Sequence, residues 1–173
     1  EEVGSNTLSE VETKNDITLQ DEQRKQTNGL SSTEDSQNKE GNTIQRVFSD
    51  VINRVHTAVG KIGKSIEDLR FRGEEPEIKR VAKEKGLWVD DPYKSFGEKP
   101  HRVGSEANVY LNKDGKTVTK LNSAVKYDTW QDYMDAIDEH NRLFPNEPYT
   151  VKGFTELGGD LTAIVEQPVI RGK

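Results

Sequence analysis

The sequence predicts a protein of the α+β class, in which a five-stranded antiparallel sheet packs against one helix and is preceded by amphipathic helices and a disordered arm. Three observations predict it. Residues 1–42 are polar with isolated apolar residues, apolar residues recur at three- and four-residue steps from Thr43, and from about His101 short apolar runs alternate with turn residues. The first pattern is typical of disordered chain, the second of helices and the third of strands.

The arm, residues 1–42, is dominated by Glu, Ser, Thr, Asn, Gln, Asp and Lys. Such a composition buries too little apolar surface to offset the entropy lost when a backbone becomes ordered. Only 31% of the 173 residues are hydrophobic, which agrees with a partly unfolded chain. We interpret the arm as an acidic and polar linker. A segment that folds on a partner, with Val11, Ile17 and Leu19 as anchors, is the alternative.

Composition argues against several classes of function. The net charge of −6 and the interspersed Lys and Arg residues argue against a nucleic-acid partner, because such binding depends on clustered cations. The chain has no Cys, and His56, His101 and His140 are far apart, so no metal site is expected. No apolar run is long enough to span a membrane, and the first residues lack the features of a signal peptide. We therefore expect a cytoplasmic protein without a membrane partner.

An amphipathic helix is predicted over residues 43–75, with Asn42 or Thr43 as its N-cap. Gly60 and Gly63 each cost about 1 kcal/mol inside a helix, so we expect a bend or a break there. The part over residues 43–69 fits a coiled-coil or partner-binding helix, and it fits equally a helix packed on its own chain. Its apolar stripe consists of Ile44, Val47, Phe48, Val51, Val55, Val59, Ile62, Ile66 and Leu69.

Residues 76–98 predict a short helix and a connector. Pro76 suits the first turn of a helix and Gly86 suits the left-handed position that follows one. The buried face of this helix would hold Ile78, Val81 and Ala82. The following stretch, residues 87–93, is apolar and acidic and contains Pro92, so we interpret it as a folded-back connector.

Residues 99–173 predict the sheet. Two runs, 109–111 and 117–121, flank an Asp-Gly turn at residues 114–115 and predict a tight hairpin. A helix is predicted from about Asp128 to Phe144, with Asp128 and Gln131 as a capping box. Two more strands, 151–157 and 161–166, are joined by Gly158-Gly159-Asp160. A short strand before Gly104 completes the five.

The predicted sheet carries several motifs in a fixed order. Residues 104–111 read Gly-Ser-Glu-Ala-Asn-Val-Tyr-Leu, and Val118-Thr119-Lys120 lie on the third strand. His-Asn-Arg-Leu-Phe-Pro at 140–145, Gly-Phe-Thr-Glu at 153–156 and Val-Glu-Gln-Pro at 165–168 follow. With these motifs, residues 80–171 resemble the N-terminal lobe of the kinase-like domain of bacterial polyvalent proteins, which phages and conjugative elements encode. The resemblance implies a protein-kinase fold, ATP as the cofactor and the parent protein as a kinase of the Ser/Thr type.

The resemblance implies that nine residues bind the nucleotide: Gly104, Ser105, Glu106, Val109, Val118, Lys120, Glu166, Gln167 and Val169. Alternation along a strand places Val118 and Lys120 on one face, so an apolar wall for the base and a cation for the phosphates would face one cleft, as in the kinase template. A solvent-facing strand lysine is the alternative for Lys120. The loop at residues 104–108 has one glycine where kinases have three.

The helix supplies a Glu partner for the strand lysine in the kinase template, and Glu139 is the available candidate. Glu139 falls opposite Ile137 on the helix, which favours solvent. The expected apolar stripe of this helix holds Trp130, Met134, Ile137, Asn141 and Phe144. A buried amide needs hydrogen bonds, so we expect His140 and Asn141 to fasten the helix to neighbouring backbone rather than to contact a ligand.

At the far end of the resemblance, Val165 resembles the residue at the back of the adenine pocket, and residues 166–169 resemble the hinge. Kinase hinges bind adenine through backbone groups. Pro168 has no N–H, so the donor is expected to be Gln167 or Val169.

The residues that transfer phosphate in the kinase template belong to its second lobe. No segment of the 173 residues is similar to the His-Arg-Asp or Asp-Phe-Gly motifs. We therefore expect a nucleotide-binding fragment, truncated at the hinge, that is inactive alone and whose partner is the missing second lobe with its Mg²⁺. A degenerate pseudokinase of a mobile element and a non-catalytic interaction module that docks a partner on the 43–69 helix are the alternatives.

Overall fold

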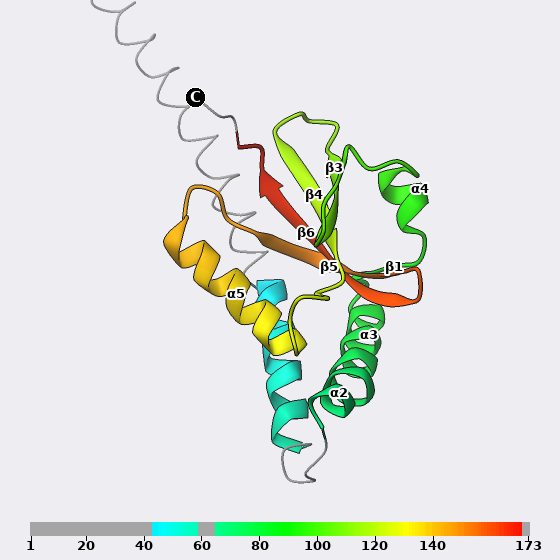
Figure 1. Ribbon diagram of the computed structural model, residues 1–173, viewed down its shortest axis with the longest axis vertical. Helices are drawn as coiled ribbons and strands as arrows, with labels where there is room; N and C mark the ends of the chain where they lie inside the picture. Colours follow the sequence, from blue (N-terminus) through cyan, green and yellow to red (C-terminus); the bar gives the residue numbers. More distant parts are fainter. Residues whose placement is uncertain (1–42, 59–64, 171–173) are drawn as a thin grey trace, which may run out of the picture. The chain divides into compact units, whose positions relative to one another are not determined.

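The computed structural model describes residues 43–58 and 65–170, whose elements are shown in Figure 1. The arm and the two glycines at which we expect a break lie outside these residues. A helix spans residues 43–58. The other elements are α2 (Ile66–Asp68), the π-helical η1 (Leu69–Glu74), α3 (Glu75–Glu84), β1 (Trp88–Val89), α4 (Pro92–Phe96), β2 (Arg102–Val103), β3 (Ala107–Leu111), β4 (Thr117–Asn122), α5 (Trp130–Leu143), β5 (Thr150–Leu157) and β6 (Asp160–Pro168).

The α+β class is confirmed, but the prediction of a five-stranded antiparallel sheet is wrong. Within the described residues the sheet has six strands in the order β1-β5-β6-β4-β3-β2, and β1 runs parallel to β5. This sixth strand comes from the stretch that we interpreted as a connector. It has two residues, too few for an alternating pattern, and it forms because Phe154 N donates to Leu87 O at 2.9 Å and Thr155 Oγ1 donates to Val89 O at 2.7 Å.

The predicted hairpin joins β3 to β4. Gly115 has a φ of +64°, a left-handed conformation that glycine adopts without steric cost. The Asp114 carboxylate accepts the N–H groups of Lys116 and Thr117 at 2.8 and 3.1 Å, and these bonds hold the pKa of Asp114 below its ordinary value. Asp114 and Gly115 therefore fix the register of the β3–β4 hairpin. This register decides which side chains of β3 and β4 lie opposite each other on one face of the sheet.

The helix α5 begins at Trp130, later than predicted, and the predicted capping box is wrong. Thr129 is the N-cap: its hydroxyl accepts the N–H of Asp132 at 3.1 Å, and the Asp132 carboxylate accepts the N–H of Thr129 at 3.1 Å. Asp128 and Gln131 also carry side-chain acceptor oxygens at the same three-residue spacing, one residue earlier, so the sequence pattern fits both boxes. Phe144, which we expected on the apolar stripe, is 53% exposed beyond the end of α5.

The main core lies between the helices and one face of β5 and β6. The helix over residues 43–58 contributes Phe48 and Ile52, both fully buried, and the Phe48 ring meets that of Phe154 edge-on at 4.6 Å. Gln45 Nε2 also donates to Asp138 Oδ1 on α5 at 2.6 Å. Of the two interpretations of this stripe, the structure shows the helix packed on its own chain. A smaller cluster on the other side joins Tyr110, Leu121 and Ile164 to Val89 and Phe96.

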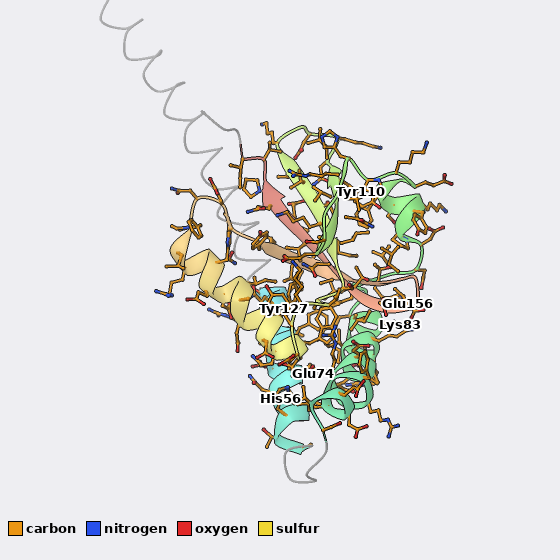
Figure 2. The ribbon with its side chains drawn as sticks, viewed as in Figure 1. His56, Glu74, Lys83, Tyr110, Tyr127 and Glu156 are labelled. Atoms are coloured by element: carbon orange, nitrogen blue, oxygen red, sulfur yellow. The ribbon has the colours of Figure 1, made fainter. Side chains whose placement is uncertain are left out.

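A buried polar network fixes the start of α5. The fully buried carboxylate of Glu74 accepts the N–H groups of Trp130 and Gln131 at 2.7 and 3.2 Å, where a helix N-terminus favours negative charge. Nε2 of His56 lies 2.5 Å from the same carboxylate (Figure 2). Arg70 donates to the carbonyls of residues 123, 124 and 127. Through these bonds η1 holds the segment between β4 and α5, which borders the cavity described below.

Candidate functional site

A cavity of about 620 Å³ opens between the sheet, α5 and the loop that follows β2. Gly104, Ser105 and Glu106 line it from the loop, and Val109, Lys120 and Val165 line it from the sheet. Ile137, His140 and Tyr149 close the side next to α5. Residues from widely separated parts of the sequence thus meet around one space, and Lys120 is among them.

The strand register explains why these side chains share a face. Arg102 is opposite Val109, Val109 is opposite Lys120, and Lys120 is opposite Val165. Directly opposite residues of an antiparallel pair lie on the same side of a sheet. A row across β2, β3, β4 and β6 therefore carries two basic side chains with one apolar residue between them. Val118 lies on this face by alternation but does not line the cavity.

The Lys120 ammonium is held by Tyr149. Its Nζ donates to the Tyr149 hydroxyl at 3.1 Å and lies 4.8 Å from the centre of the Tyr149 ring. The candidate partner, Glu139, does not face Lys120, as its helical phase predicts: its side chain is 67% exposed and lies 3.7 Å from Arg142. The reason is the helical phase, because Glu139 lies on the side of α5 away from the sheet.

His140 and Asn141 bind backbone atoms of the segment that follows α5. Asn141 Nδ2 donates to Tyr149 O at 2.9 Å, and Tyr149 N donates to Asn141 Oδ1 at 2.7 Å. Nε2 of His140 lies 3.0 Å from Glu147 O, and its ring centre lies 4.2 Å from that of Tyr149. Both side chains therefore fasten α5 to the residues that lead into β5.

The loop over the cavity is tied to the segment between β4 and α5. Lys126 Nζ lies 2.7 Å from Glu106 Oε1 and donates to Ser105 Oγ at 3.2 Å. Gly104 N donates to Ala107 O at 2.9 Å, and this bond closes the turn. A Cβ at Gly104 would lie 3.2 Å from Ala107 O, so the tight turn favours glycine at this position.

The expected hinge residues lie apart from the cavity. Glu166 Oε2 accepts from Asn112 Nδ2 at 3.2 Å, and Gln167 Nε2 donates to Glu147 O at 3.2 Å. Val169 N donates to Lys116 O at 2.8 Å, so this expected adenine donor is already bonded to the chain before β4. Gln167 stands two residues before Val169 and is opposite Val118 of β4. Because N–H groups two residues apart in an extended chain point to the same side, the N–H of Gln167 points toward β4, as that of Val169 does. The two expected donors thus point to β4.

Two tyrosines complete the cavity next to α5. Burial, with smaller contributions from Tyr127, Tyr149 and Glu106, raises the pKa of Tyr133 well above its ordinary value, so its hydroxyl stays protonated. The Tyr127 ring, labelled in Figure 2, meets that of Tyr133 edge-on at 5.3 Å. The wall therefore offers neutral aromatic groups rather than additional charge.

Among the lining residues that sequence reasoning missed, Arg102 and Tyr149 carry the polar chemistry used below. Arg102 stands two residues before Gly104, and its pairing with Val109 places it on the same face of the sheet as Lys120, with Val109 between them. Tyr149 follows the irregular segment after α5, and no local pattern indicates that its hydroxyl meets Lys120. In the described residues no group of three or more His, Cys, Asp or Glu side chains could hold a metal ion. In that same part of the chain no helix has the length and apolar character to cross a membrane.

The cavity combines cationic and apolar side chains. Arg102 and Lys120 offer cations that suit phosphate oxygens, and Val109 and Val165 offer apolar contact. Comparison with curated proteins and with solved structures returned no match. The family model described as serine/threonine/tyrosine kinase found in polyvalent proteins matches residues 72–173, more than half of the 173 residues. The chain therefore belongs to this family of polyvalent-protein kinases.

Proposed function

We propose that this chain is the nucleotide-binding lobe of a kinase-like unit and that its cofactor is ATP. The observation that carries the proposal is the row of Arg102, Val109 and Lys120 on one face of the sheet, beside the loop that begins at Gly104. Kinases cover the phosphates with a glycine loop and pair them with a lysine on the third strand of this lobe. Lys120 occupies the corresponding strand here, and Arg102 adds a second cation.

In this proposal the loop at residues 104–108 binds phosphate through its backbone. Backbone N–H groups of residues 105–107 bind phosphate oxygens while Lys126 holds Glu106 and Ser105 in place. With one glycine the loop approaches phosphate less closely than a three-glycine loop, so the two basic side chains supply most of the affinity. The apolar floor at Val109 and Val165 contacts the sugar and the base.

We further propose that this chain alone binds nucleotide without transferring phosphate. The kinase template takes its catalytic Asp and its metal-holding Asp and Asn from a second lobe. The 173 residues contain no segment similar to those motifs. In this proposal a second lobe and its Mg²⁺ complete the site, and Lys120 holds the nucleotide that the second lobe uses.

The test is a calorimetric titration of ATP, with and without Mg²⁺, into the 173-residue chain. We expect saturable binding in the wild type and a dissociation constant at least about tenfold higher in Lys120→Ala, because a charge-assisted hydrogen bond contributes about 1.5–3 kcal/mol. Lys113→Ala, which removes an exposed cation from the hairpin, is the matched control and should bind like the wild type. Equal affinity in Lys120→Ala and the wild type would exclude the proposal.

A further inference from the structure

In the cavity, the ammonium of Lys120 contacts both the hydroxyl and the ring of Tyr149. We infer that Tyr149 is the positioning residue of Lys120 and that it replaces the helix glutamate of the kinase template. Its effect on ligand binding rests on the proposed nucleotide site, but the contact itself does not.

A strand lysine needs a partner to stay in one conformation. Its four-carbon stem has several rotatable bonds, and its ammonium is strongly hydrated, so an unheld Lys120 would sample many orientations. Glu139 does not provide the partner, and within residues 43–58 and 65–170 no carboxylate forms an ion pair with Lys120. Tyr149 is the side chain that restrains the ammonium, through its hydroxyl at 3.1 Å and its ring at 4.8 Å.

A neutral partner has a consequence for binding that an acidic one lacks. A carboxylate would cancel the charge of Lys120, and an incoming phosphate would have to compete with an ion pair. The Tyr149 hydroxyl and ring hold the ammonium in place while leaving its positive charge uncompensated. Arg102 lines the same cavity, so the site keeps two cations for an anionic group.

Tyr149, the partner of Lys120, is itself held by Asn141 and His140 of α5. The Asn141 amide binds both the N–H and the carbonyl of Tyr149, at 2.7 and 2.9 Å, so the backbone of Tyr149 cannot rotate without breaking both bonds. The His140 ring packs on the Tyr149 ring at 4.2 Å between centres. The chain of contacts therefore runs from α5 through Asn141 and Tyr149 to Lys120, so α5 sets the position of the lysine indirectly.

The competing role for Tyr149 is that of an aromatic surface on which the base stacks. The two roles depend on different parts of the side chain. Tyr149→Phe removes the hydroxyl and keeps the ring, and Tyr149→Leu removes both. Tyr93→Phe is the matched control, because Tyr93 is half exposed on α4, away from the cavity lining.

The first measurement uses the full chain without ligand. NMR relaxation of the Lys120 side-chain carbons and of its ammonium reports how strongly that side chain is restrained. We expect Lys120 to be clearly more ordered than Lys113 in the wild type and in Tyr93→Phe. It should lose part of this order in Tyr149→Phe and fall to the level of Lys113 in Tyr149→Leu. Unchanged order of Lys120 in Tyr149→Leu would overturn the inference.

The second measurement is a double-mutant cycle on ATP binding. We expect Tyr149→Phe to raise the dissociation constant about threefold to tenfold, the effect of one hydrogen bond, and to have no further effect in a Lys120→Ala background. A tyrosine that only stacks on the base would give Tyr149→Phe the affinity of the wild type. A tyrosine that only stabilises the fold would give losses that add to those of Lys120→Ala. Either result would overturn the inference.

The two measurements separate this inference from the proposed function. If the wild type does not bind ATP, the proposed function fails, while the order of Lys120 in the unliganded variants still decides whether Tyr149 positions it. If ATP binds and depends on Lys120 but not on the Tyr149 hydroxyl, the proposed function stands and the inference fails.

Discussion

Gly153 lies where the backbone of β5 approaches Leu87 too closely for any side chain. A Cβ at this position would lie 2.2 Å from Leu87 O, and the register between β5 and β6 shifts between Val151 and Gly153. The close approach lets Phe154 N donate to Leu87 O and places β1 beside β5. It also keeps Val151 and Phe154 in the same core. One glycine thus permits the sixth strand.

We predict that Gly153→Ala lowers the free energy of unfolding by about 2 kcal/mol or more, because the methyl group overlaps a carbonyl that cannot move without breaking the β1–β5 pairing. Urea denaturation followed by circular dichroism measures it. Gly158→Ala is the matched control: its φ is +63° and nothing lies within 4 Å of its Cβ, so only the backbone cost of about 1 kcal/mol applies. Equal losses in the two variants would contradict this explanation.

Residue types and alternation predict much of the cavity, but not its contacts. Period-two alternation correctly relates residues along β4, and the structure brings Gly104, Ser105, Glu106, Val109 and Lys120 around one space. Glu166, Gln167 and Val169 do not line this cavity. The partner of Lys120 could not be predicted, because it depends on how an irregular segment of the chain folds back onto α5.

Elements with strong turn or boundary signals were predictable, and elements without such signals were not. The hairpin and α3 appear as predicted, because an Asp-Gly turn and a Pro-to-Gly helix have strong local signals. The two-residue β1 has none, since its pairing with β5 alone defines it. The capping box of α5 was misplaced by one residue because neighbouring positions carry equivalent polar groups.

The pairing of β4 with β6 gives a prediction about base recognition. Pro168 has no N–H, Val169 N bonds to Lys116 O, and Gln167 N points to β4, so these residues offer no donor to a base edge. We expect ATP and GTP to bind with dissociation constants within about threefold of each other, because phosphate contacts then dominate. Competition with a fluorescent nucleotide measures this, with tripolyphosphate as the base-free control. A preference for ATP of more than about tenfold would show that another backbone group reads the base.

For the molecule as a whole, the folded core is larger than the region that the family model matches. The match begins at residue 72, yet Phe48 and Ile52 are fully buried in the core that also contains Phe154. Periodicity alone could not tell a partner-binding helix from one packed on its own chain, because both bury one stripe. Contacts with the rest of the chain decide between these two roles, and the sequence of the helix alone does not specify those contacts.

We predict that Phe48→Ala lowers the free energy of unfolding by about 3–5 kcal/mol, since it removes a fully buried ring and leaves a cavity against Phe154. Chemical denaturation of the 173-residue chain provides the measurement. Asn53→Ala, on the exposed face of the same helix, is the control and should change stability by less than about 0.5 kcal/mol. A small effect of Phe48→Ala would mean that this helix is not part of the cooperative core.

In the proposed function, the cavity beside Lys120 binds the phosphates of a nucleotide. The most direct test is an NMR titration of ATP into the isotope-labelled chain, with the amide shifts mapped onto the fold. We predict that the largest shifts fall on residues 104–109 and on Lys120 and Tyr149, while α4 and the hairpin turn at 113–115 stay unchanged. A second cavity is lined by residues of the helix over 43–58 and of α3, including Val51 and Val81. Shifts that are absent at millimolar ATP, or that centre on this second cavity, would contradict the proposal.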